Sequence, residues 1–268
     1  MAKELKPVAF PALTEEMGQA VALFDTKDVV TGLEDVTPQD LSLPRLAILQ
    51  DGMSDQLKPK KAEFIEGAKA GQFCDTALGR VWDSIAVIPC YFARIYLEWK
   101  PERGEGLVAN HGLDVSVVRG LSLDNPKYPG TWRTKGGNLI VETPTYYVLN
   151  MTEPVTGRRG FIPLTSSQVK RSKRWMDQIT TEKLMRADGS KFPAPLYWRV
   201  WFTEAVEESN NKGDWFGWKF TPGPNILELD PTHKVLEAAQ QFAKDAKDGL
   251  VQLDVTKMEN EAGDGGAF

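Results

Sequence analysis

The sequence predicts a mainly β (α+β) protein, built on an OB-like barrel to which two helices are added. Runs rich in Ile, Val, Tyr and Phe are separated by Pro and Gly, which is typical of short strands joined by turns. Two other segments carry apolar residues at helical spacing. Acidic segments flank this body, so we expect an arm over residues 1–43, an OB-like domain over residues 44–253 and a flexible tail over residues 254–268.

The composition of the 268 residues is that of an ordinary globular protein, with 41% apolar and 26% charged residues. No apolar run approaches the roughly 18 residues of a membrane span, and the polar first residues do not resemble a signal peptide. The two cysteines are too few for a disulfide framework or a four-thiolate metal site, and the two histidines leave little material for a zinc site or for histidine-based catalysis. We therefore expect a soluble, cytoplasmic protein, in the bacterial host cytoplasm if it is viral, with no cofactor and no metal.

At least five strands are expected. The clearest covers residues 84–99, where Pro89 indicates a bend or an edge because proline has no N–H for the ladder. Residues 197–203 and 215–220 form the two sides of a predicted hairpin, whose turn lies at residues 207–213. Further strands are expected over residues 139–141, 146–150 and 159–164.

Two helices are expected. The first begins at residues 165–168, where Thr and Gln have the spacing of a capping box, and runs to about residue 185. The second follows Pro231, which suits an early helical position, and ends at Gly249. Its apolar residues, among them Phe242, recur at helical spacing, so we expect an ordinary packing helix.

The charge is distributed unevenly, although the net charge is only −5. Residues 1–43 hold eight acidic and three basic side chains, whereas residues 158–199 hold ten basic and three acidic ones. Within this basic block, four cations gather around one tryptophan on the first helix. Like charges on one helix repel each other, so a phosphate backbone is a fitting partner, and the alternative is a solvated face with acidic neighbours. The residues of this candidate surface are Lys170, Arg171, Lys173, Arg174 and Trp175.

The predicted hairpin offers a second candidate surface for nucleic acid. The two-residue period of a strand places Tyr197, Arg199 and Trp201 on one face, which Trp215 and Lys219 of the other strand can share. Bases stack on such rings for about 1–3 kcal/mol each, while cations follow the backbone. The alternative is that these rings fill the core of a two-sided sheet. A neighbouring mobile loop is expected to add Trp132, Arg133 and Lys135.

The C-terminal tail is acidic and glycine-rich, and it ends in Phe268. Its acidic side chains include those of Glu259, Glu261 and Asp264. A flexible tail of this kind can compete for a basic groove, or present Phe268 to a pocket on a partner protein.

Together with a strand-rich body and a basic, aromatic surface, this tail resembles that of the single-stranded DNA-binding (helix-destabilising) proteins of bacteria and tailed bacteriophages. Residues 145–175 are also similar to part of phage replication-module proteins of this size. The resemblance implies a non-catalytic protein that coats single-stranded DNA, without strong sequence preference, during phage DNA replication or recombination. It also implies that the tail binds replication or recombination proteins. No membrane partner is expected, because the sequence holds no apolar run long enough to span a bilayer.

Two alternatives remain. Asp83 and the segment Glu98-Trp99-Lys100 have the loose spacing of an acid, acid-x-lysine motif, by which metal-dependent nucleases hold a divalent cation and position a water nucleophile. His111 has no evident partner in the sequence and is expected in a loop. The other alternative is a virion or scaffold protein whose aromatic residues all lie in the core.

Overall fold

The computed structural model describes residues 42–101, 106–125, 130–153, 156–210, 213–253 and 255. The predicted arm, up to residue 41, and the tail residues Glu259, Glu261, Asp264 and Phe268 lie outside them. The described strands are β1 (Ser42–Leu43), β2 (Leu46–Ile48), β3 (Phe73–Asp75), β4 (Arg80–Trp82), β5 (Ser84–Trp99), β6 (Leu107–Asn110), β7 (Ser122–Leu123), β8 (Thr131–Arg133), β9 (Leu139–Asn150), β10 (Arg158–Pro163), β11 (Lys183–Met185), β12 (Lys191–Pro193), β13 (Arg199–Asn210), β14 (Gly213–Asn225) and β15 (Gln252–Leu253). The α-helices are α2 (Val169–Thr181), α3 (Ile226–Leu229) and α4 (Lys234–Lys247), and short 3₁₀ helices include η3 (Ser166–Gln168) and η4 (Leu196–Trp198).

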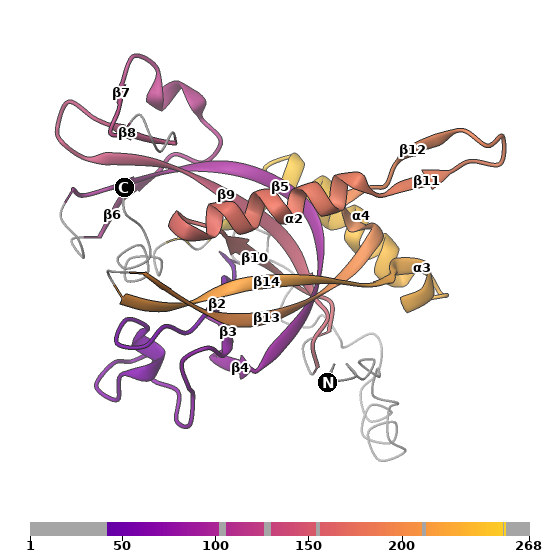
Figure 1. Ribbon diagram of the computed structural model, residues 1–268, viewed down its shortest axis with the longest axis horizontal. Coiled ribbons are helices and arrows are strands. Elements are labelled where there is room, and N and C mark those ends of the chain that lie inside the picture. The colour runs from indigo at the N-terminus through magenta and orange to yellow at the C-terminus, as the bar shows by residue number, and fades with distance from the viewer. Residues whose placement is uncertain are drawn as a thin grey trace, which may run out of the picture.

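Two long antiparallel strands, β5 and β9, form the centre of the largest sheet, which has eight strands within the described chain (Figure 1). β5 pairs with β13 at its beginning and with β6 at its end. β9 pairs with β8 at its beginning and with β10 at its end, while β14 and β7 extend the sheet outwards. The sheet curls into a half-barrel, which confirms the predicted mainly β class and is compatible with an OB-like barrel carrying added helices.

The short strand β2 lies between the two edges of this half-barrel. Arg45, directly before β2, forms a parallel bridge with Phe161 of β10. Gly160 permits this approach, because a Cβ there would lie 3.2 Å from the carbonyl oxygen of Pro44. Gln50 follows β2 in the chain. Its side-chain Oε1 accepts from the Phe216 N–H at 2.8 Å, and its Nε2 donates to the Phe216 carbonyl at 2.9 Å. Gln50 thus takes the place of a neighbouring strand at the edge of β14.

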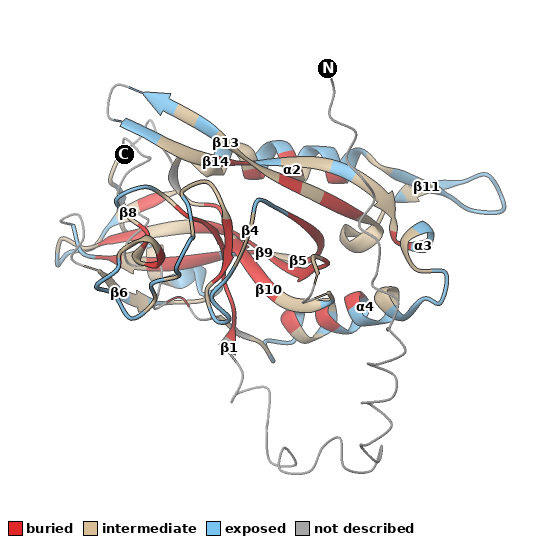
Figure 2. Cartoon of the chain, turned by 90° about the horizontal axis from the view of Figure 1, so that it is seen from below, coloured by how far each residue is buried: buried red, intermediate tan, exposed pale blue. Residues whose placement is uncertain are grey.

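One helix covers each face of the sheet (Figure 2). Along β9, Tyr146 and Val148 belong to the core beneath α2, whereas Tyr147 and Leu149 belong to the core beneath α4. A strand that is buried on both faces reads as a continuous apolar run, as the stretch from Tyr146 to Leu149 does. The centre of the sheet therefore offers no open aromatic face.

The observed strands lie where the sequence predicted strands, but several of them are longer than predicted. The predicted strands at residues 139–141 and 146–150 are parts of the single strand β9, and β5 shifts its register between Pro89 and Tyr91, where a bend was predicted. The predicted hairpin is present as β13 and β14, which run to Asn210 and from Gly213, so its turn is shorter than expected.

The first helix differs from its prediction at both ends. Gln168 does not close a capping box, because its Oε1 accepts from the N–H of Trp218 on the edge strand β14, at 3.0 Å. The helix ends at Thr181, and the next residues form β11 instead of a last turn. The second helix is α4, followed by Gly249 with a φ of +72°, as expected of its C-terminus. Within the described chain, no helix is both long and apolar enough to cross a membrane.

Candidate nucleic-acid interface

Helix α2 turns its aromatic residue inwards and its cations outwards. Trp175 is only 1% exposed, and its ring stacks on that of Phe220 with 3.7 Å between centroids and contacts Tyr146 at 4.3 Å. Together with Ser172 and Ile179, it forms the buried stripe of an amphipathic helix. Trp175 therefore does not lie on the candidate surface to which the sequence assigned it, because its ring fills the core of the half-barrel.

The four cations of α2 divide into one that is paired and three that are not. The Nε and an Nη of Arg171 donate to Oε1 of Glu208 at 3.0 and 2.6 Å, which ties α2 to β13. Lys170, Lys173 and Arg174 are exposed, and none of them forms an ion pair with another described residue. These three side chains are defined here as the cationic row of α2.

The register of the hairpin separates the aromatic residues that the sequence placed together. Trp201 lies opposite Pro222 and Trp215 lies opposite Glu208, so the two tryptophans are on opposite faces of the β13–β14 pair. Trp201 is 3% exposed and belongs to the core beneath α2, whereas Trp215 is half-buried. Tyr197 is in η4, outside the strand, and packs against the core beneath α4. Of the rings and cations expected on one face of the hairpin, Trp215 and Lys219 share a face, whereas Trp201 lies on the other one and Tyr197 lies outside the strands.

The described part of the hairpin is also acidic. Lys219 shares its face with Trp215 and binds Glu204 at 2.8 Å, and Arg171 already occupies Glu208. Glu207 and Asp214 are exposed. A phosphate backbone would meet more negative than positive charge on these residues.

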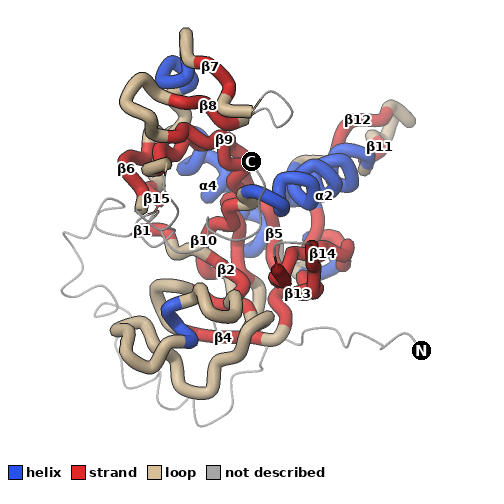
Figure 3. The backbone as a smooth tube through the Cα atoms, turned by 60° about the vertical axis from the view of Figure 1, so that its left-hand side comes forward, coloured by secondary structure: helices blue, strands red, loops and turns tan. Residues whose placement is uncertain are grey.

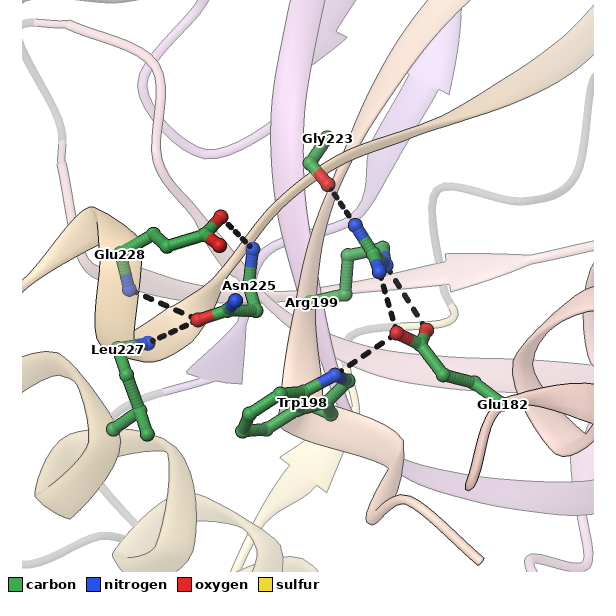
Figure 4. Close-up of polar contacts among 7 residues, drawn as sticks. All are labelled: Glu182, Trp198, Arg199, Gly223, Asn225, Leu227 and Glu228. Carbon is green, nitrogen blue, oxygen red and sulfur yellow. Dashed lines mark hydrogen bonds and ion pairs between the residues drawn. The ribbon is translucent and has the colours of Figure 1, made fainter. Parts of the chain in front are cut away.

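The guanidinium of Arg199 is paired with groups of the protein itself (Figure 4). It forms a two-pronged ion pair with the carboxylate of Glu182 and donates to the carbonyl of Gly223, while Nε1 of Trp198 donates to Glu182 at 3.0 Å. The hydrogen bonds from Arg199, and secondarily that from Trp198, lower the pKa of Glu182, and the same ion pair raises the pKa of Arg199. Arg199 therefore anchors the end of α2 to β13 and β14.

The other predicted loop residues lie on or beside a strand. Trp132 and Arg133 belong to β8, which pairs with β9, and this corrects their assignment to a mobile loop. The ring of Trp132 contacts that of Tyr96 at 6.0 Å, and Arg133 forms an ion pair with Asp124. Lys135 is exposed in the turn that leads into β9.

Sequence reasoning missed a basic hairpin, formed by β11 and β12 and defined here as residues 183–193. It continues from the end of α2 and projects away from the large sheet (Figure 3). Lys183, Arg186 and Lys191 are exposed on it, with the Arg186 guanidinium 4.5 Å from the ring centroid of Phe192. The signal was present in the sequence as an Asp-Gly pair at positions 188 and 189, a strong indicator of a tight hairpin turn.

The residues of the nuclease alternative do not meet. Asp83 precedes β5 and Glu98 is near its other end, so at about 3.3 Å per residue roughly 40–50 Å of strand separates them. Glu98 accepts from Nδ2 of Asn138 at 2.7 Å and contacts Nε2 of His111 at 2.8 Å, and these bonds lower its pKa. His111 thus has the carboxylate partner that the sequence did not reveal. No group of three His, Cys, Asp or Glu suited to a metal ion occurs among the described residues.

Comparisons with known proteins place the chain in a phage context. Searches of curated proteins and of solved structures found no match. The family model of the Pam3 phage gp34-like protein matches residues 14–252, which is most of the chain. Phage origin was implied by the resemblance drawn from the sequence, and the match confirms that part of it. The chain belongs to the Pam3 phage gp34-like family.

Proposed function

We propose that this phage protein binds single-stranded DNA through the cationic row of α2, coating the strand without catalysis. The observation that carries the proposal is that Lys170, Lys173 and Arg174 have no ion-pair partner in the described chain, whereas Arg171 and Arg199 of the same basic block do. Neighbouring like charges on a helix destabilise it, and phosphates that lie along the row would relieve this repulsion.

The burial of Trp175 and Trp201 changes the expected balance of forces. Phosphate contacts carry no sequence information, so binding that depends mainly on the cationic row is expected to be tolerant of sequence and strongly dependent on salt. Three rings of the candidate set are half-buried, and because Tyr197 packs against the core beneath α4, Trp132 and Trp215 remain for stacking on bases.

The test is the salt dependence of binding to a fluorescently labelled oligo-dT, followed by anisotropy. For single strands, the log of affinity falls with log salt at about −0.7 per phosphate neutralised, so K170Q/K173Q/R174Q should flatten the slope by about 2. The variant K60Q/K69Q/K244Q removes three other exposed lysines and should keep the wild-type slope. An unchanged slope in the α2 variant would remove the cationic row from the interface.

A virion or scaffold protein is the second candidate, favoured by the burial of Trp175 and Trp201 in the core. It predicts that no polynucleotide binds, even at low salt. The role in replication or recombination, and the docking of partner proteins by the tail with Phe268, stay predictions from the resemblance.

A further inference from the structure

Two hairpins of opposite charge lie at opposite ends of the long axis of the molecule. The basic hairpin projects at one end, and the ends of β13 and β14 next to their turn lie at the other, as two views agree (Figures 1 and 2). We define the acidic tip as the described residues from Glu207 to Asn210 and from Gly213 to Phe216. The cationic row of α2 lies on neither hairpin, so the DNA interface proposed above includes neither of these surfaces.

One face of the basic hairpin combines two cations with an exposed apolar side chain. Lys183 lies opposite Pro193 and Met185 lies opposite Lys191, so the four side chains share a face. Met185 is 70% exposed, the highest value among the large apolar residues described, and both lysines are exposed. Neither lysine forms an ion pair within the described chain.

One face of the acidic tip carries two carboxylates. Glu207 lies opposite Phe216 and Asp214 lies opposite Ser209, which places both carboxylates on one face. Both are exposed, and neither is ion-paired with a described residue, in contrast to Glu204 and Glu208 on the other face.

The two charge pairs also have matching geometry. In each hairpin, the second charged residue is two positions before the direct cross-strand partner of the first: Lys191 precedes Pro193, and Asp214 precedes Phe216. Such diagonal neighbours are about 7–8 Å apart in any antiparallel pair. The lysine pair of one chain can therefore face the carboxylate pair of another with both ion pairs formed together.

We propose that copies of this chain associate head to tail, with the Lys183–Met185–Lys191 face of the basic hairpin of one copy on the Glu207–Asp214 face of the acidic tip of the next. Because the two surfaces differ and lie at opposite ends, the contact is heterologous and extends into a row of copies unless it closes into a ring. An isolated two-stranded hairpin is only marginally stable in water. Packing against a neighbouring copy would therefore stabilise the projecting basic hairpin.

The exposed methionine favours a protein partner over a phosphate backbone for this face, since phosphate offers nothing apolar to cover it. Exposed ion pairs contribute little each, so the contact is weak and sensitive to salt. It does not depend on nucleic acid, and the following test is therefore made without any.

The experiment is sedimentation velocity of the full chain over a range of concentrations. At low salt, the weight-average sedimentation coefficient of the wild type should rise with concentration, and high salt should abolish the rise. K183E/K191E and E207K/D214K should each remain monomeric, because each carries two like-charged surfaces. A mixture of the two variants should associate again, because each variant supplies the surface that the other lacks.

Two matched variants control for net charge. K244E/K247E and D51K/E66K make the same charge changes at exposed positions elsewhere and should associate as the wild type does. A wild type that stays monomeric at all concentrations, or variants that fail to associate when mixed, would overturn the proposal. Loss of association with intact binding of oligo-dT would separate this contact from the cationic row of α2.

Discussion

Helix α2 and the β13–β14 hairpin are both rich in aromatic and charged residues, but the fold treats them in opposite ways. On α2, the ring is buried and three of the four cations stay exposed without an ion pair in the described chain. On the hairpin, Lys219 binds Glu204, Arg199 binds Glu182, and the exposed charges that remain among the described residues of the tip, Glu207 and Asp214, are acidic. The difference shows that the positive charge available to a partner depends on pairing in the fold, which a count along the chain does not measure.

The largest expected effect concerns the buried side of α2. Trp175→Ala removes a ring that is stacked on Phe220 and enclosed by the half-barrel, so unfolding free energy should fall by about 3–5 kcal/mol. Chemical denaturation measures this loss, and Trp215→Ala at the half-buried hairpin position should cost less. Unchanged stability together with weakened DNA binding would instead mean that Trp175 acts at the surface.

A smaller effect is expected when Arg171 is released from the hairpin. Glu208→Gln removes the carboxylate that holds Arg171, which adds a fourth unpaired cation to α2. The slope of log affinity against log salt should then steepen by about 0.7. Anisotropy titrations with oligo-dT measure this slope.

The matched variant is Glu204→Gln, which releases Lys219 on the hairpin instead. If the interface is confined to α2, this variant keeps the wild-type slope, and stability changes by no more than about 0.5 kcal/mol for an exposed pair. Equal steepening in both variants would extend the interface onto the hairpin.

The smallest effect concerns the pH dependence of the Glu182–Arg199 anchor. Because the pKa of Glu182 is lowered below 4.5 in the folded state, its carboxylate stabilises the fold above that value, and this contribution is lost as the pH falls through the lowered pKa. The stability advantage of the wild type over Glu182→Gln should therefore be full near neutral pH and shrink in acid. Urea denaturation at several pH values tests this.

Glu66→Gln is the control, since Glu66 is exposed and forms no ion pair with another described residue. It should differ little from the wild type at any pH. An advantage of the wild type over Glu182→Gln that did not change with pH would show that the ion pair contributes nothing to the anchor.

Patterns with a short range were predicted well. The helical spacing around Phe242 and the apolar run of β5 both correspond to observed elements, because periodicity reports the local backbone directly. The capping box at Gln168 failed, since a nearby strand edge offered its amide another partner. The basic hairpin was missed although an Asp-Gly turn marked it, because the first helix was extended through its first strand.

The candidate surface shows where local reasoning ends. Which face Trp201 and Trp215 share depends on the register of β13 and β14, and a change of one residue moves a side chain to the other face. Register follows from the turn and from the two cores, and both are properties of the whole sheet. The sequence therefore predicted which strands carry the aromatic residues, but it did not determine which face of the sheet each ring occupies.

The sequence by itself determined the class of this protein: mainly β, with an amphipathic basic helix, a packing helix and a strongly uneven charge. These properties depend on residue type and on hydrophobic periods of two and about 3.6 residues, which can be recognised from the order of the residues alone. Only the tertiary structure decided that Arg171 and Arg199 are neutralised by Glu208 and Glu182, and that Lys170, Lys173 and Arg174 have no ion-pair partner among the residues that the structure describes. The physical reason is that ion pairs form between charges within about 4 Å, and the partners of both arginines are brought there by strand pairing and helix packing.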